Sequence, residues 1–166
     1  WCERALVCRG GEALGGDCVG HHVAGFLGRG VNLQRWPLCG RNFEYFSEDG
    51  VLAGTLAKAY IEGVQSKGVG TSLKHFAANN REYDRFFQSS ELDERTLRET
   101  YCRAFEIALR AQPWTVMCSY TPIHGILDSQ NTHLLREIFR GALGFDAVYL
   151  SERGQGRHRG PSPGVC

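Results

Sequence analysis

The 166-residue sequence lacks the features that mark several protein classes. It has no run of about 18 apolar residues, so we expect no membrane-spanning helix. Residues 1–30 contain no continuous apolar core, which argues against a signal peptide. The net charge is only +1, so charge predicts neither a nucleic acid nor an acidic partner. We therefore expect no nucleic acid and no membrane as a partner, and both secreted and cytoplasmic locations stay open.

Patterns that bind metals and nucleotides are also missing. None of the seven cysteines form a CxxC pair, so a zinc ribbon is not expected, and reduced thiols are the simplest interpretation. His21 and His22 lie near Asp17 and Cys18, but no further ligand follows at a suitable spacing. Neither GxxxxGK[ST] nor a GxGxxG after a strand is present. We expect no metal and no cofactor.

The composition is otherwise that of a globular protein, with 42% hydrophobic and 22% charged residues. Glycine is concentrated at the two ends of the chain, where no helical or strand periodicity is visible. We therefore divide the chain into an irregular glycine-rich segment at 1–26, a folded domain at 27–152, and a disordered basic tail at 153–166.

The middle of the chain alternates between short apolar runs and helical periodicity. Strands are predicted at 31–33, 71–75, 115–119 and 147–150, and helices at 48–66, 94–111 and 132–142. Ser47 and Asp93 are expected helix N-caps. This alternation predicts an α/β fold with a parallel sheet. A complete (β/α)₈ TIM barrel needs about 250 residues, so about four βα units make an incomplete barrel. A doubly wound sheet is the weaker alternative because no nucleotide-binding motif is present.

Polar side chains gather where the predicted strands end. Lys74 and His75 close the second strand, Arg41 follows the first, Tyr120 follows the third, and Glu152 follows the fourth. Carboxyl ends of parallel strands share one edge, so these residues are expected to converge there. A dense set of hydrogen-bond donors suits a ligand covered in hydroxyl groups.

Residues 27–151 resemble the barrel domain of glycoside hydrolase family 3, the β-glucosidase type. The likeness includes GRNFEYFSED at 40–49 and KHFAANN at 74–80. The loop after His75 lacks the Pro-Gly-His-Gly of the family's N-acetylhexosaminidase branch. Further stretches with the family's order and spacing are Leu27–Leu33, Gly63–Val69, Asp93–Glu99 and Trp114–Tyr120.

The resemblance implies a role for several residues. Donors to the sugar hydroxyls would be Arg41, Lys74, His75 and Arg85. Met117 and Tyr120 would form the wall beside the anomeric carbon. The reaction would be retaining hydrolysis of terminal β-D-glucosyl residues, which needs two carboxyl groups. The substrate would be a β-glucoside or an oligosaccharide.

This sequence departs from the family pattern at the nucleophile. The family's fourth strand ends in Ser-Asp-Trp-Gly, whose Asp is the nucleophile, whereas this chain has Ser151, Glu152, Arg153 and Gly154. The acid/base has no counterpart, and the missing C-terminal domain of the family would supply it. The remaining carboxylates, Glu44, Glu48, Glu82 and Glu94, are interpreted as helix or loop residues.

We therefore expect a β-glucosidase-like hydrolase fragment that is inactive alone. Three alternatives stay open: a non-catalytic sugar-binding remnant, β-xylosidase-type specificity, and a purely structural fragment.

Overall fold

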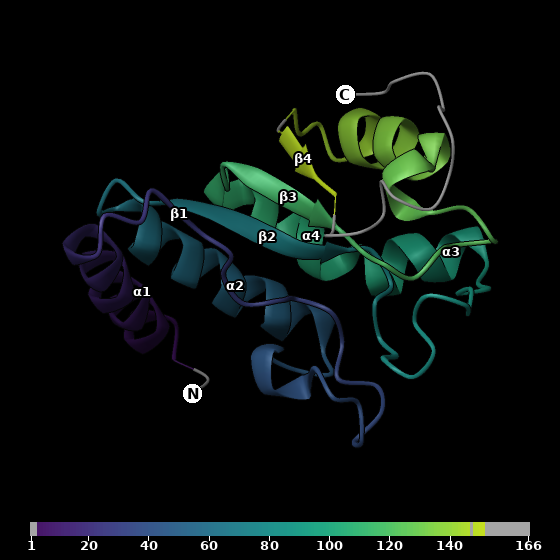
Figure 1. Cartoon of the computed structure of the whole chain (residues 1–166), viewed down its shortest axis with the longest axis horizontal. Helices are drawn as coiled ribbons and strands as arrows, with labels where there is room; N and C mark the ends of the chain where they lie inside the picture. The colour runs from purple at the N-terminus through teal and green to yellow at the C-terminus, as the bar shows by residue number, and fades with distance from the viewer. Residues whose placement is uncertain (1–2, 147, 152–166) are drawn as a thin grey trace.

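The computed structural model describes residues 3–146 and 148–151. Its centre is a parallel sheet with strand order β1-β2-β3-β4 (Figure 1). The strands span Gly25–Phe26 (β1), Gly70–Phe76 (β2), Thr115–Cys118 (β3) and Val148–Leu150 (β4). β2 pairs with β3, and β3 with β4, in the parallel sense. The predicted parallel α/β arrangement is confirmed.

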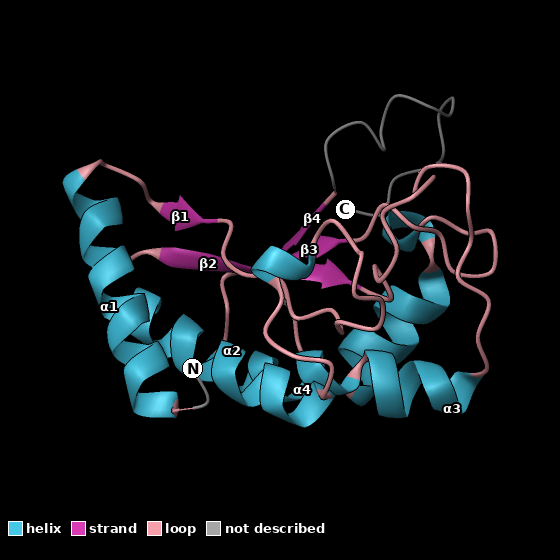
Figure 2. Cartoon of the chain, turned by 90° about the horizontal axis from the view of Figure 1, so that it is seen from below, coloured by secondary structure: helices cyan, strands magenta, loops and turns pink. Residues whose placement is uncertain are grey.

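Helices line one side of this sheet, and long loops extend beyond the arrowheads of β2 and β3 (Figure 2). The longest helices are α1 (Arg4–Gly20) and α2 (Gly50–Gln65). Between β2 and β3 runs one helical stretch made of α3, η2, α4 and η3, spanning Glu94–Thr96, Leu97–Tyr101, Arg103–Ala108 and Leu109–Ala111. The shorter elements are η1 (Asn42–Glu44), η4 (Asp128–Gln130) and η5 (His133–Ala142).

Side-chain caps explain where two helices begin. The Asp49 side chain accepts a hydrogen bond from the Leu52 amide at 2.6 Å, so Asp49 is the N-cap of α2 and not Ser47. Ser47 acts one step earlier, where its hydroxyl accepts from the Asp49 amide. Asp93 caps α3 as predicted, because its carboxylate accepts from the Thr96 amide at 2.9 Å.

The first strand lies earlier than predicted. β1 pairs Gly25 and Phe26 with Gly70 and Thr71, whereas residues 31–33 form no regular strand. Gly30 makes the next contact as an isolated bridge to Lys74. From Phe26 to Gly30 the chain advances by four residues, whereas β2 advances by three, from Thr71 to Lys74. The extra residue breaks the ladder. The Val31 amide still donates to the Lys74 carbonyl at 2.8 Å, and side-chain hydrogen bonds of Asn32 and Asn80 hold the rest of 31–33.

The prediction of an irregular N-terminal segment was wrong, because residues 4–20 form α1. That prediction relied on the missing helical periodicity, but two of the glycines form a packing face. A Cβ added to Gly11 would lie 2.5 Å from the Tyr60 carbonyl oxygen, and one added to Gly15 would lie 2.9 Å from that of Val64. Both carbonyls belong to α2. The small side chains let the two helix backbones approach, and this contact outweighs the low helix propensity of glycine.

The main core lies between the sheet and its helices. Phe76 from β2 packs edge-on against Phe105 of α4 and Phe139 of η5, with both ring centroids at 5.0 Å. All three side chains are fully buried. Among the described helices, none is both long and apolar enough to cross a membrane.

Candidate functional site

An irregularity in β2 aims two consecutive side chains at the same place. Lys74 pairs with Met117 and Phe76 pairs with Cys118, so His75 is an extra residue on β2. Side chains on a regular strand alternate between faces. The bulge lets Phe76 point into the core while both Lys74 and His75 reach one cluster of polar side chains. The Asn32 side chain holds the bulge, donating to the His75 carbonyl and accepting from its amide, both at 2.9 Å.

Arg41 and Glu44, from the loop after β1, complete the first half of this cluster. The Arg41 guanidinium lies 2.9 Å from His75 Nε2 and forms an ion pair with Glu44. Glu44 also accepts from Lys74 Nζ at 3.0 Å. His75 is 1% exposed, and the side chains of Lys74, Glu44 and Arg41 are at most 20% exposed. These donors are therefore fixed and largely withdrawn from water.

The second half comes from the loop after β2. The Glu82 carboxylate pairs with Arg85 at 2.8 Å and lies 3.8 Å from Arg41 Nη1. It also accepts a hydrogen bond from the side-chain amide of Asn79 at 3.2 Å. The Arg85 guanidinium stacks on the Tyr120 ring at 4.6 Å from its centroid. Glu82 thus joins the two halves, and we call the whole set, Arg41, Glu44, Lys74, His75, Glu82, Arg85 and Tyr120, the strand-end cluster.

The charges of the strand-end cluster set its chemistry. Burial on its own would raise the pKa of Glu44, but hydrogen bonds from Arg41 and Lys74 outweigh it and hold the pKa below its usual value. Burial likewise lowers the pKa of Arg41, yet the bond to Glu44 leaves it raised. Glu44 therefore stays ionised and is a poor proton donor near neutral pH. Its role is to orient cations whose remaining N–H groups can bind a ligand.

Most of the predicted site residues come together in this cluster. Met117 lies beside Lys74 in register on β3, on the same face of the sheet. Glu152, which the sequence predicts at the nucleophile position, lies outside the described residues. Glu44 and Glu82 had been interpreted as ordinary helix or loop carboxylates, but both belong to the cluster. The signal that identifies them is their spacing, because Arg41 with Glu44 and Glu82 with Arg85 are each three residues apart.

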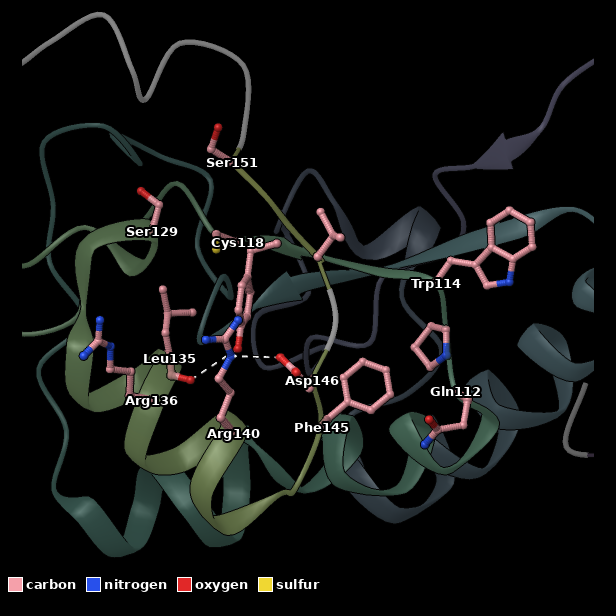
Figure 3. A pocket seen from close by; sticks show the side chains of 13 residues that line it. Gln112, Trp114, Cys118, Ser129, Leu135, Arg136, Arg140, Phe145, Asp146 and Ser151 are labelled. Atoms are coloured by element: carbon pink, nitrogen blue, oxygen red, sulfur yellow. Dashed lines mark hydrogen bonds and ion pairs between the residues drawn. The ribbon is translucent and has the colours of Figure 1, made fainter. Parts of the chain in front are cut away.

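A larger hollow than any at the cluster lies away from it, along β4. This hollow of about 890 Å³ runs beside η5, and Figure 3 shows Trp114, Phe145 and Arg140 on its walls. Arg140 pairs with Asp146 at 3.2 Å inside it. None of its lining residues belongs to the strand-end cluster. We therefore base the site on the cluster, where cations and an imidazole converge.

Within residues 3–146 and 148–151, no group of three or more histidine, cysteine, aspartate or glutamate side chains could hold a metal ion. The cluster presents N–H donors, carboxylates that accept hydrogen bonds, and one aromatic wall. This combination suits a neutral ligand with several hydroxyl groups and an apolar face.

Comparisons with known proteins agree with this chemistry. Residues 30–157 match the model described as the glycosyl hydrolase family 3 N terminal domain. The chain is 52% identical over 158 residues to an exo-alpha-(1->6)-L-arabinopyranosidase of Bifidobacterium longum, covering 95% of this chain and 21% of that enzyme. It is 50% identical to the thermostable beta-glucosidase B of Acetivibrio thermocellus, covering 92% of this chain and 20% of that enzyme. Coverage of 95% means that the likeness extends into residues 1–26, where none was expected.

Solved structures give the same result. Beta-glucosidase 3B of Thermotoga neapolitana, in complex with glucose, superposes with a TM-score of 0.88 at 43% identity, over 91% of this chain and 21% of that one. The family 3 β-glucosidase of Bifidobacterium adolescentis also gives 0.88, at 49% identity, over 91% of this chain and 23% of that one. This chain therefore spans about a fifth of the length of these relatives. Its four parallel βα units are an incomplete TIM-barrel fold, and the chain belongs to glycosyl hydrolase family 3.

Proposed function

We propose that this chain is the sugar-recognition part of a retaining β-glucosidase and that its strand-end cluster holds a terminal β-D-glucosyl residue. Arg41, Lys74, His75 and Arg85 donate to the sugar hydroxyls, and Met117 and Tyr120 form the wall beside the anomeric carbon. The observation that carries the proposal is the convergence of Arg41, Lys74 and His75 in a partly buried cluster of a family 3 chain.

The physical case rests on the cost of leaving buried donors unsatisfied. Lys74 and Arg41 are already oriented by Glu44, so binding a sugar loses little side-chain entropy. A sugar that fails to pair with these donors leaves them without a partner, which costs about 1–3 kcal/mol for each group. Such a site selects its ligand by the positions of the hydroxyl groups.

For catalysis, Glu152 would occupy the nucleophile position in place of the family's aspartate. The two carboxyl groups of a retaining enzyme lie about 5–5.5 Å apart. The acid/base would come from a part of the longer enzyme that this chain does not include. Glu44 does not fill that role, because its cation partners keep it ionised.

A second specificity is favoured by one observation, the 52% identity to an arabinopyranosidase. An α-L-arabinopyranosyl group differs from a β-D-glucosyl group by the missing hydroxymethyl group and by the orientation of the hydroxyl at C4. The donors of the strand-end cluster could serve either sugar. The same holds for a β-xylosyl group, which lacks only the hydroxymethyl group.

Saturation-transfer NMR on the 166-residue chain at low protein concentration tests the proposal. We expect methyl β-D-glucopyranoside to receive saturation, and Lys74→Ala to weaken its binding by about 10-fold or more. Lys58→Ala is the matched control, because Lys58 pairs with Glu62 on the surface of α2. Equal binding by the two variants would refute the site. Titrating the α-L-arabinopyranoside and the β-xyloside in parallel ranks the three sugars.

A further inference from the structure

Asn79 is a buried residue that binds the strand-end cluster but is not one of its proposed sugar donors. It lies three residues after the end of β2 and is 1% exposed. A side-chain amide carries two N–H donors and an oxygen that can accept twice, so a buried amide needs several partners. The partners of Asn79 therefore indicate what it does.

The nitrogen of the Asn79 amide binds two groups. Nδ2 donates to Glu82 Oε1 at 3.2 Å and to the Tyr45 hydroxyl at 3.1 Å. That hydroxyl donates in turn to the Asn79 main-chain carbonyl at 3.0 Å. Because an ionised carboxylate can only accept, Glu82 fixes which end of the amide carries the nitrogen. Glu82 thus has a buried donor on Oε1 and the Arg85 guanidinium, at 2.8 Å, on Oε2.

The oxygen of the same amide binds the two residues that flank Tyr120. Asn79 Oδ1 accepts from the Ser119 hydroxyl at 3.3 Å and from the Thr121 hydroxyl at 3.2 Å. Both of these residues are buried. They follow the end of β3 directly, so the amide joins the chain after β2 to the chain after β3.

These contacts close a ring of interactions at the carboxyl ends of the two strands. Asn79 binds Glu82, and Glu82 pairs with Arg85. The Arg85 guanidinium lies 4.6 Å from the centroid of the Tyr120 ring. The neighbours of Tyr120 bind Asn79, which completes the ring. One amide therefore holds both members of the Arg85–Tyr120 pair, the first through a carboxylate and the second through the backbone.

We propose that Asn79 is a positioning residue, which sets the Arg85 guanidinium against the Tyr120 ring where the sugar binds. The inference rests on the proposed function, because that function gives Arg85 and Tyr120 their roles toward the sugar. Asn79 itself does not touch the sugar. It acts through Glu82 on one side and through the backbone on either side of Tyr120 on the other.

Asn79→Asp tests this assignment, because it replaces only the donating nitrogen by an oxygen. At pH 8 the introduced carboxylate would face that of Glu82, and like charges repel. At pH 5 the two groups can share one proton, since a neighbouring negative charge raises the pKa of a carboxyl group. The shared proton restores a donor to Glu82. The Arg85–Tyr120 pair should therefore be disturbed at pH 8 and restored at pH 5.

Other groups around Asn79 and Glu82 carry charge or titrate. These are Tyr45, Arg41 and Glu44 from the loop after β1, His75 from β2, Arg85 from the loop after β2, and Asp128 beside Ser119. They are present in the wild type and in the variant alike. Each variant is therefore compared with the wild type at the same pH, which cancels their own titration.

Two measurements on the 166-residue chain follow the pair. The first is the Nε–H NMR signal of Arg85, which is assigned by its loss in Arg85→Lys. In Asn79→Asp this signal should differ from that of the wild type at pH 8 and return toward it at pH 5. The second is saturation-transfer NMR with methyl β-D-glucopyranoside. Its affinity should fall about 10-fold at pH 8, as for the loss of one charge-assisted hydrogen bond, and recover to within about 3-fold at pH 5.

Asn80→Asp is the matched control. Asn80 is the next residue on the same loop, and its amide donates to the Leu33 carbonyl. This variant should leave the Arg85 signal like that of the wild type at both pH values. A loop that is merely loosened would alter the signal in both variants and without recovery at pH 5.

Circular dichroism at each pH checks that the variants fold. If Asn79→Asp unfolds at pH 8, the double variant Asn79→Asp/Glu82→Gln decides, because only one carboxyl group then remains in the pair. It should fold at both pH values, and its Arg85 signal should not change with pH relative to the wild type. A double variant that unfolds, or whose signal still depends on pH, would overturn the inference.

The remaining outcomes separate the inference from the proposed function. An Arg85 signal and an affinity in Asn79→Asp that match the wild type at both pH values, or are equally altered at both, would overturn the positioning role. Glucoside binding that is still lost in Lys74→Ala would then leave the proposed function standing. Absence of glucoside binding by the wild type would remove the proposed function and this inference with it.

Discussion

Asp128 is a carboxyl group buried at the carboxyl ends of the strands. It is 0% exposed, and one of its oxygens accepts from the Ala77 amide at 2.9 Å. Burial raises its pKa well above the usual value, although hydrogen bonds from Ala77 and Ser119 act in the opposite direction. The folded protein therefore favours the protonated form. Asp128 thereby joins η4 to Ala77, two residues after His75.

Asp128 predicts how stability depends on pH. The pKa of Asp128 is higher in the folded state than in the unfolded state. Its contribution to stability is therefore complete below the pKa of the unfolded state, near pH 4, and is lost as the pH rises toward the pKa of the folded state. Asp128→Asn cannot ionise. Relative to the wild type, it should therefore gain stability as pH rises from 4 to 7, by at most about 1.4 kcal/mol per pH unit.

Urea unfolding followed by circular dichroism at several pH values measures this difference. Asp128→Ala is the comparison variant, because it removes the acceptor for the Ala77 amide and should be destabilised at every pH. A constant difference between wild type and Asp128→Asn from pH 4 to 7 would contradict the prediction.

Single carboxylates also decide what the strand-end cluster can do. Glu44 and Glu82 each bind cations from two different positions in the chain. These ion pairs fix the positions of the donor side chains within the cluster. Removing either carboxylate would leave partly buried cations without a partner. The loss of stability would then exceed the net stabilisation that the ion pair provides.

At the level of elements, the contact between α1 and α2 depends on glycine. Gly11 and Gly15 lie on the buried side of α1, whereas Gly10 and Gly16 lie on its exposed side. Nothing lies within 4 Å of a Cβ added to Gly10, but one added to Gly11 would lie 2.5 Å from a backbone oxygen of α2. The same residue type therefore has opposite effects at neighbouring positions of one helix.

This contrast predicts opposite results for two alanine substitutions. Gly11→Ala should destabilise the fold by about 1–3 kcal/mol, because the backbone of α2 must shift to admit the methyl group. Gly10→Ala should stabilise it by up to about 1 kcal/mol through helix propensity. Chemical unfolding of both variants gives the comparison. Equal changes in stability at the two positions would mean that α1 does not pack closely on α2.

The bulge in β2 is the element that makes the candidate site. Without the extra residue, Lys74 and His75 would face opposite sides of the sheet. The bulge turns both toward Arg41 and Glu44 while returning Phe76 to the core. A regular strand with the same composition could place either the lysine or the histidine in the cluster, but not both.

At the level of the whole molecule, the chain corresponds to about a fifth of its relatives. The described carboxylates of the strand-end cluster, Glu44 and Glu82, are both engaged by cations. The lowered pKa of Glu44 makes it a poor proton donor. Under the proposed function, recognition of the sugar therefore rests on this cluster, and bond cleavage rests on carboxyl groups outside it.

We predict that the 166-residue chain has no measurable glycosidase activity. The family resemblance puts Glu152 at the position of the nucleophilic aspartate. A glutamate side chain is one methylene longer than aspartate, and a misplacement of about 1 Å can cost about 10²-fold in rate. Assays with an aryl β-glucoside should therefore give the same rate for wild type and Lys74→Ala. Glu152→Asp alone should not restore activity, since the second carboxyl group is still required. Turnover by the wild type above that of Lys74→Ala would disprove this.

The sequence by itself determined the parallel βα order, the Asp93 cap and the family, because periodicity, capping and local motifs are short-range properties. It also indicated that Arg41, Lys74, His75 and Tyr120 meet at one edge, since strand ends in a parallel sheet coincide. Only the tertiary structure decided the rest. Gly11 forms a helix because α2 packs against it, and Glu44 and Glu82 join the site because cations distant in sequence surround them. Register and close packing depend on partners far along the chain, which no local pattern contains.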